Sequence, residues 1–353
     1  MTSRFQPRGA WTALVTPFTP HGDFDARAYT RLLEFQLAEG IDGLVPCGTT
    51  GESPTLSWEE QGAAVALAVR LADGRAGVLA GTGSNSTQEA IDGTRDAWSR
   101  GASAALLVDC YYNGPSSLEL RREYYERVLE AVPELPIVPY VIPGRTGCIL
   151  GSEDLAILHA SDPVRVPAVK SATGDLAHMR RDRECAGDTL QILSGDDELT
   201  SGMMRDPAIK ASGVISVMAN IAPRAVADLC RAEAAGEIET ASALNRALTP
   251  LFALVTCKTH NPRTLPGGRE VQVQDRFRNP VPVKTMMMGL GMVDRALRPP
   301  LGPMTAPAVA TCRAALLQVQ TESPHVLAPI AAAFDVNIER RLRDDNLWSQ
   351  LVG

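Results

Sequence analysis

The stretch Val166-Pro167-Ala168-Val169-Lys170-Ser171 is the sixth of eight short apolar runs that we predict to be buried parallel β-strands. Segments with helical spacing of apolar residues separate these runs. The other seven predicted strands span residues 11–18, 43–47, 76–82, 104–109, 136–143, 190–195 and 213–218. The helical segments span residues 25–39, 87–100, 117–131, 153–159, 176–185 and 199–206, with a further helix starting at Ser57. Strict alternation of this kind predicts an α/β protein with a (β/α)8 barrel, also called a TIM barrel.

An open doubly wound sheet is the alternative to the barrel. Such a sheet is expected to carry Gly-x-Gly-x-x-Gly after its first strand, whereas Thr16-Pro17-Phe18 follows here. Gly81-Thr82-Gly83 contains only part of that motif and comes at the third strand. We therefore predict a catalytic barrel over residues 1–221 and a helical C-terminal region over residues 222–353.

The C-terminal region is predicted to be mainly helical. A Pro-, Gly- and Arg-rich insertion near residues 257–282 interrupts the helices and contains a possible short hairpin at 270–277. An extra tail follows near residues 321–353. The predicted helices of this region span residues 223–235, 238–255, 283–290, 306–320 and 324–334.

The composition is that of an ordinary soluble globular protein. The 353 residues are 45% hydrophobic and 21% charged, and the net charge of −7 argues against nucleic acid as the main partner. No apolar run reaches the roughly 20 residues of a membrane helix, and the first residues lack the core of a signal peptide. The seven cysteines are scattered, which favours the cytoplasm, and the five histidines show no metal-ligand spacing. We expect no metal and no cofactor.

Lys170 is one of four lysines in a chain with thirty arginines. A lysine can lose its proton and attack a carbonyl group as a free amine, whereas an arginine cannot. Its place near the end of a buried strand would lower its pKa and so favour the neutral amine. The alternative is that Lys170 simply carries its charge into solvent at a strand end.

Other polar groups follow the predicted strands at the same end of the barrel, where active sites of this fold lie. Hydroxyl groups can relay the protons of imine formation, and Arg145 is suited to bind a carboxylate. The backbone amides of residues 48–51 could hold a second carboxylate. Taken singly, each motif could be a turn or a packed aromatic step. The motifs that follow the predicted strands are Gly48-Thr49-Thr50-Gly51-Glu52-Ser53, Tyr111-Tyr112-Asn113, Tyr140, Pro143-Gly144-Arg145-Thr146-Gly147 and Ser194-Gly195-Asp196-Asp197.

These motifs, together with Val169-Lys170-Ser171-Ala172-Thr173-Gly174, resemble the dihydrodipicolinate synthase / N-acetylneuraminate lyase family. The resemblance spans roughly residues 10–256 and resumes from Pro282 to about Leu317. It implies a barrel with C-terminal helices, no cofactor, and an imine between pyruvate and a lysine. The paired threonines and Arg145 look like the synthase form, which condenses pyruvate with L-aspartate 4-semialdehyde in lysine and diaminopimelate biosynthesis. A pyruvate-dependent aldolase, lyase or dehydratase acting on a sugar acid is the alternative.

The resemblance also implies roles for single residues. Lys170 forms the imine, and the proton relay consists of Tyr140, Thr50 and Tyr112, with Tyr112 reaching across a subunit interface. Such a relay needs at least a homodimer, and a homotetramer is expected. The residues implied in substrate binding are Thr49, Arg145, Gly195 and Ile215. Regulated members of the family bind L-lysine as an inhibitor, and the residues at the matching positions here are Ser53, Trp58, Asn85, Glu89 and Tyr111.

The sequence departs from the family pattern at two positions beside the expected catalytic groups. Val141 follows Tyr140 where an asparagine is usual, and Ser171 follows Lys170 where a glutamate is usual. The first change removes an amide side chain beside the phenol, and the second removes a carboxylate beside the amine. The insertion and the tail are also atypical of the family.

Overall fold

The computed structural model describes residues 5–294 and 297–353. Eight parallel strands close into a barrel in sequence order, which confirms the predicted fold. The strands are β1 (Gly9–Ala13), β2 (Gly43–Val45), β3 (Gly77–Gly81), β4 (Ala104–Val108), β5 (Ile137–Val141), β6 (Ala168–Ser171), β7 (Gln191–Ser194) and β8 (Gly213–Ser216).

The first strand begins and ends earlier than the predicted range of 11–18. β1 starts at Gly9, which pairs with Gly213 of β8, and its last paired residue is Ala13. Beyond it, the backbone amide of Val15 donates to the side chain of Asn220 at 3.1 Å. The apolar run therefore continues past the strand because its residues stay buried after they leave the sheet.

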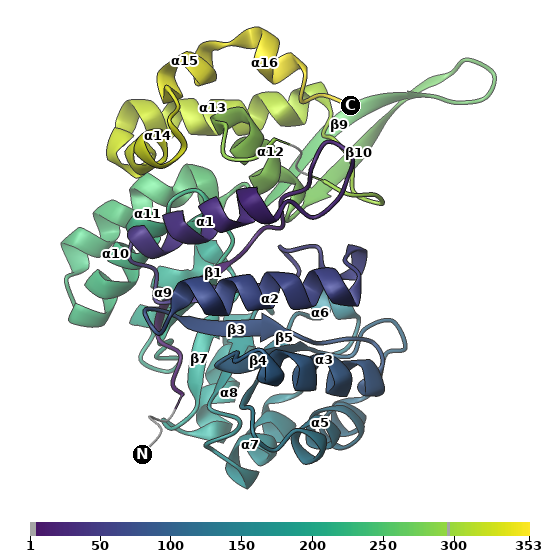
Figure 1. The fold of residues 1–353 in the computed structure, drawn as a ribbon, viewed down its shortest axis with the longest axis vertical. Helices are drawn as coiled ribbons and strands as arrows, with labels where there is room; N and C mark the ends of the chain where they lie inside the picture. The colour runs from purple at the N-terminus through teal and green to yellow at the C-terminus, as the bar shows by residue number, and fades with distance from the viewer. Residues whose placement is uncertain (1–4, 295–296) are drawn as a thin grey trace.

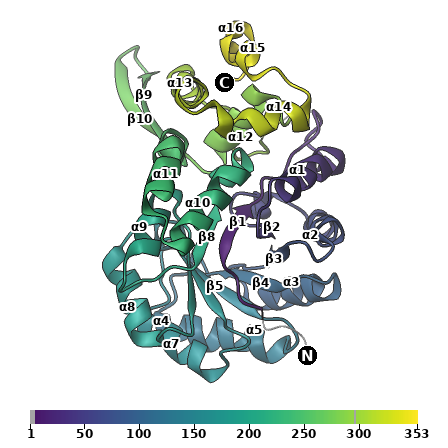
Figure 2. The ribbon, with the colours of Figure 1, turned by 90° about the vertical axis from the view of Figure 1, so that its left-hand side faces the viewer.

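Helices follow the strands around the outside of the barrel (Figures 1 and 2). The predicted start at Ser57 is confirmed, since Ser57 and Glu60 form a reciprocal capping box. The helices are α1 (Ala26–Ala38), α2 (Trp58–Ala72), α3 (Thr87–Ser99), α4 (Ser117–Glu119), α5 (Glu126–Ala131), α6 (Pro143–Thr146), α7 (Ser152–Ser161), α8 (Leu176–Ala186), α9 (Thr200–Arg205) and α10 (Pro223–Ala235). A π-helical stretch, Leu120–Tyr125, joins α4 to α5. α10 packs against β1 and β8, which is the place of the eighth barrel helix.

A tryptophan fills the amino-terminal end of the barrel. The indole ring of Trp11 lies so close to Gly43 that a Cβ atom there would be 2.0 Å from the ring. Gly77 is similarly close, at 2.4 Å. Apolar side chains from the other strands complete this interior cluster. The amino-terminal end is therefore closed, and free space remains at the carboxyl ends of the strands.

The C-terminal region continues from α10 into α11 (Ile238–Phe252) and then leaves the barrel. Figures 1 and 2 show its last helices gathered beyond one end of the barrel. These are α12 (Val281–Leu290), α13 (Ala306–Glu322), α14 (Ala328–Phe334), α15 (Ile338–Arg343) and α16 (Asp345–Ser349). The first three agree with the sequence prediction, whereas α15 and α16 lie in the tail.

The insertion forms a long antiparallel hairpin between α11 and α12. Its strands β9 (Thr256–Thr264) and β10 (Glu270–Arg278) have nine residues each, so the hairpin is longer than the possible 270–277 hairpin of the sequence prediction. It extends away from the body of the protein (Figure 1). Most of its side chains are exposed. Only its base lies against the barrel.

Candidate active site

Lys170 and Tyr140 lie side by side at the carboxyl ends of β6 and β5. The two residues are partners in the parallel register, and the Lys170 Nζ atom lies 3.9 Å from the centre of the Tyr140 ring. Lys170 is only 5% exposed. The structure therefore places this lysine inside the barrel rather than in solvent.

Burial lowers the pKa of Lys170 to about 8, although the negative charges of Asp196 and Asp197 oppose the shift. At pH 7 roughly a tenth of such an amine is neutral, compared with about 0.03% for a pKa of 10.5. The site thus supplies a substantial fraction of the nucleophilic form near neutral pH.

Gly195, at the end of β7, leaves room for the lysine side chain. A Cβ atom at this position would lie 2.7 Å from the Cβ atom of Ala172 and 3.1 Å from the Cε atom of Lys170. Its backbone amide donates to the carbonyl of Ser171 at 2.7 Å. Close approach of backbone and lysine therefore requires glycine here.

The hydroxyl group beside Tyr140 belongs to Thr49. Burial raises the pKa of Tyr140 to about 12, although the charge of Arg145 and a hydrogen bond with the Thr49 hydroxyl oppose the rise. The neighbouring Thr50 is buried, and its Oγ1 atom accepts a hydrogen bond from the Asn279 side chain at 2.9 Å. These contacts favour the reverse of the sequence expectation, which placed Thr50 in the relay and Thr49 in substrate binding.

Arg145 lies in the short helix α6, at the mouth of the site. Its Nη2 atom donates to the backbone carbonyl of Asn279 at 2.8 Å. Burial lowers the pKa of Arg145, and repulsion from Arg278 and Arg276 adds to this effect. The nearby Tyr140 raises the pKa of Arg145 and so opposes the shift. Arginine nevertheless stays charged at all ordinary pH values.

One cavity of about 230 Å³ is lined by Lys170, Tyr140, Thr50, Gly195 and Arg145, whereas Thr49 lines a larger neighbouring cavity. Ile215 is fully buried in the barrel interior, and Val217, two residues further on, lines the cavity instead. Ten of the described lining residues had no role in the sequence prediction, and four of these are charged or carry an amide. Asp196 stood in a quoted motif without a role, and the other three lie near the end of the insertion, where no local pattern marks them: Arg276, Arg278 and Asn279.

Tyr112 points into solvent, away from this cavity. It is 89% exposed, and its backbone has φ of +80°, a conformation that non-glycine residues seldom adopt. Tyr112 is not among the described residues that line the cavity. Tyr112 therefore does not reach the lysine of its own chain.

Four of the five residues predicted for lysine binding lie around α3, three of them near its start and Trp58 against its middle. Ser84 donates to the Glu89 carboxylate at 2.6 Å, and the Tyr111 hydroxyl is hydrogen-bonded to Ser84 and to the backbone of Asn85. Trp58 lies against Gly93 of α3. The fifth residue, Ser53, shares a larger cavity of about 840 Å³ with Tyr111 and Thr49.

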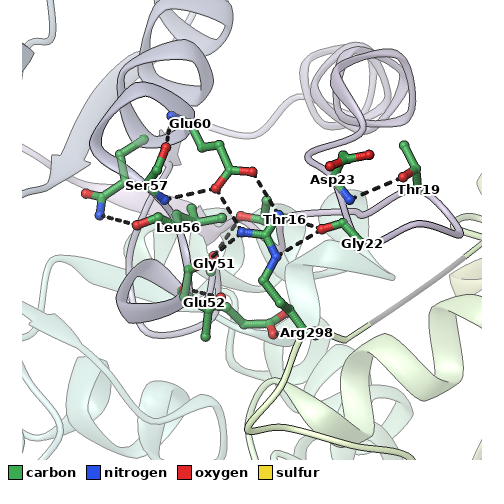
Figure 3. A network of polar contacts seen from close by, with 12 residues as sticks. Thr16, Thr19, Gly22, Asp23, Gly51, Glu52, Leu56, Ser57, Glu60 and Arg298 are labelled. Atoms are coloured by element: carbon green, nitrogen blue, oxygen red, sulfur yellow. Dashed lines mark hydrogen bonds and ion pairs between the residues drawn. The ribbon is translucent and has the colours of Figure 1, made fainter.

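The loop that carries Thr49 and Thr50 is held by residues from the C-terminal region. Lys284 of α12 is fully buried, and it donates to Glu52 and to the Thr16 carbonyl. Arg298 binds both carboxylate oxygens of Glu60 at 2.8 Å and the carbonyls of Gly22 and Thr55, as Figure 3 shows in part. These contacts bind the loop between β2 and α2 to the last helices.

Residues 5–294 and 297–353 contain no group of three His, Cys, Asp or Glu side chains placed to hold a metal ion. Within the same residues, none of the helices is both long and apolar enough to cross a membrane.

Comparisons with known proteins agree with this geometry. The 4-hydroxy-tetrahydrodipicolinate synthase of Sorangium cellulosum is 43% identical over 298 residues, which cover 84% of this chain and 90% of the relative. The crystal structure of a chloride-inhibited dihydrodipicolinate synthase from Acinetobacter baumannii, complexed with pyruvate, is 34% identical with a TM-score of 0.77. It covers 88% of this chain and 98% of that one.

A third similar protein is the dihydrodipicolinate synthase of Cyanidioschyzon merolae, solved with lysine bound. It is 29% identical, with a TM-score of 0.78 over 88% of this chain and 98% of the other. The model of the dihydrodipicolinate synthetase family matches residues 6–319. The barrel, its buried lysine and these matches lead to one conclusion: the chain belongs to the dihydrodipicolinate synthetase family.

Proposed function

We propose that this protein condenses pyruvate with L-aspartate 4-semialdehyde to 4-hydroxy-tetrahydrodipicolinate, through an imine on Lys170. The observation that carries the proposal is the buried amine of Lys170 against the Tyr140 ring, with a pKa lowered to about 8. The names of its relatives favour this acceptor over a sugar acid. The product belongs to the biosynthesis of lysine and diaminopimelate.

The chemistry follows from the groups at the cavity. The neutral amine of Lys170 attacks the ketone carbon of pyruvate, and the carbinolamine loses water to give the imine. Loss of a methyl proton gives an enamine, whose carbon attacks the aldehyde carbon of the second substrate. Hydrolysis then frees the lysine, and the amino group of the product closes the ring with loss of water.

We propose that Tyr140 and Thr49 move the protons of these steps. Their hydrogen bond provides a short path beside the lysine, and burial keeps the phenol protonated near neutral pH. Thr50 and Gly195 then line the pyruvate subsite, and Arg145 binds the carboxylate of the aldehyde substrate. Ile215 supports the subsite from below.

Trapping with borohydride tests the imine directly. Reduction in the presence of pyruvate should add the mass of the reduced adduct to the peptide that contains Lys170. Because the free amine is the nucleophile, the rate of imine formation should rise as the pH rises towards about 8 and level off above it. Label on another lysine, or no label, would disprove the proposed mechanism.

We propose an assembly of at least two subunits, and a homotetramer as the full assembly, in which Tyr112 completes the relay of a neighbouring subunit. Its exposure and unusual backbone conformation support this role. Mixing inactive Tyr112→Phe and Lys170→Met subunits should restore activity at about a quarter of the sites if subunits exchange at random. An active monomer in sedimentation experiments would contradict the shared site.

We also propose that L-lysine inhibits the enzyme by binding beside α3. Glu89 would bind the ammonium group, Asn85 the carboxylate, and Trp58 the aliphatic part, with Tyr111 and Ser53 towards the active site. L-lysine should lower the rate of the wild type and have less effect on Glu89→Ala, whereas Asp92→Ala, one turn further along α3, should respond like the wild type. Unchanged rates and unchanged thermal stability at saturating lysine would refute this proposal.

A further inference from the structure

The base of the β9–β10 hairpin forms part of the wall of the active-site cavity. Arg276 and Arg278 near the end of β10 line it, together with Thr256 at the start of β9. Because side chains alternate along a strand, the two arginines share one face of β10, and Phe277 takes the other. The insertion therefore brings two guanidinium groups to the cavity that contains Lys170.

These guanidinium groups lie close to Arg145. The Nη1 atom of Arg278 donates to the carbonyl of Gly144 at 3.0 Å, one residue before Arg145. The charges of Arg278 and Arg276 contribute to the lowered pKa of Arg145. Arg145, Arg276 and Arg278 thus place three positive charges along one side of the cavity.

Asp196 also lines this cavity, but it forms no ion pair with any of the three arginines. Within residues 5–294 and 297–353, none of them forms an ion pair with a carboxylate, although Arg263 on the same hairpin pairs with Asp275 at 2.8 Å. Arg145 and Arg278 use one donor each on backbone carbonyls. The three guanidinium groups outnumber the Asp196 carboxylate in this wall and repel one another, and a bound anion would relieve that repulsion.

The position of the cluster indicates which substrate it binds. Lys170 is buried at the floor of the cavity, whereas Arg276 is exposed and Arg278 is half-buried at its mouth. Pyruvate is bonded to Lys170 and so occupies the floor. The aldehyde enters afterwards from the mouth, and its carboxylate passes these guanidinium groups.

We infer that Arg276 and Arg278 act with Arg145 to bind the carboxylate of the aldehyde substrate, so that the hairpin is a specificity element of the active site. This inference rests on the proposed function. A guanidinium group matches a carboxylate with two parallel hydrogen bonds, which a lysine cannot reproduce. The cluster selects acceptors that carry an acidic group beside the aldehyde.

Steady-state kinetics of Arg276→Gln, Arg278→Gln and the double variant test the inference. Each single change should raise KM for the semialdehyde roughly tenfold, and the double change should raise it further. KM for pyruvate and the rate of borohydride trapping should stay unchanged, because the floor of the cavity is not altered. Arg278→Lys should recover only part of the loss, since it restores the charge but not the paired hydrogen bonds.

Arg263→Gln is the matched control, because Arg263 lies on the same hairpin and pairs with Asp275 instead of lining the cavity. An unchanged KM for the semialdehyde in the double variant would overturn the inference. A rise in KM for pyruvate, or a lower melting temperature with equal loss for both substrates, would assign the arginines another role and overturn it too. If the wild type itself fails to trap pyruvate, it is the proposed function that fails.

Discussion

Replacing Lys170 with methionine should reduce condensation by about 10⁴-fold or more, because the change removes the group that bonds to pyruvate. Methionine has a similar length and no charge, so it fits the buried space beside Tyr140 without an unpaired cation. Steady-state rates and borohydride trapping measure the loss. Thermal denaturation shows whether the barrel remains folded.

Lys210→Met is the control for this variant. Lys210 is exposed, and its Nζ atom pairs with Asp188 at 3.1 Å, so its loss should leave both the rate and the trapping unchanged. A Lys170→Met protein that condenses the substrates at a rate near that of the wild type would show that the imine forms elsewhere or that no imine forms.

Replacing Lys284 with methionine should destabilise the protein by about 3–5 kcal/mol, the range observed when one partner of a buried ion pair is removed. Lys284 and Glu52 are both fully buried as side chains, and the change leaves the Glu52 carboxylate without its cation. Chemical denaturation at a fixed protein concentration measures the loss of free energy. The loop with Thr49 and Thr50 should loosen as well, which would reduce activity.

The effect should depend on pH in a defined direction. Burial already raises the pKa of Glu52 above its usual 4.5, and without Lys284 it should rise further. Since the folded state then binds the proton more tightly than the unfolded chain, stability of the variant should fall as pH rises above about 4.5. The double variant Glu52→Gln/Lys284→Met should recover much of the loss, and equal stability of both variants at pH 8 would contradict this account.

The barrel could be predicted from the sequence because each buried strand is a continuous apolar run of the expected length. The hairpin was underestimated for the opposite reason. Its strands are mostly exposed and polar, from Lys258 to Arg263 and from Glu270 to Arg276, and only Val271 and Val273 show an apolar alternation. Long exposed strands are determined by pairing with each other, which a local pattern does not show.

The site could be predicted only where its residues end successive strands. Lys170 and Tyr140 were proposed because each lies in a predicted buried strand, and the structure makes them partners in the register of β5 and β6. The contact between Asn279 and Thr50 spans 229 positions, so no spacing in the sequence predicts it. The roles of Thr49 and Thr50 depend on which way two adjacent side chains point in a loop with left-handed residues at Cys47 and Glu52, and composition does not determine this.

The hairpin also implies a gradient of tolerance to sequence change along its length. At its base, the Asn279 side chain donates to Thr50 and its backbone carbonyl accepts from Arg145, so a substitution there would remove the first contact and a shift of the backbone would disturb the second. At its tip, near residues 264–270, the side chains are mostly exposed. Insertions or deletions at the tip would leave the active site in place. Natural variants of this protein can therefore differ in hairpin length while the residues at its base remain fixed.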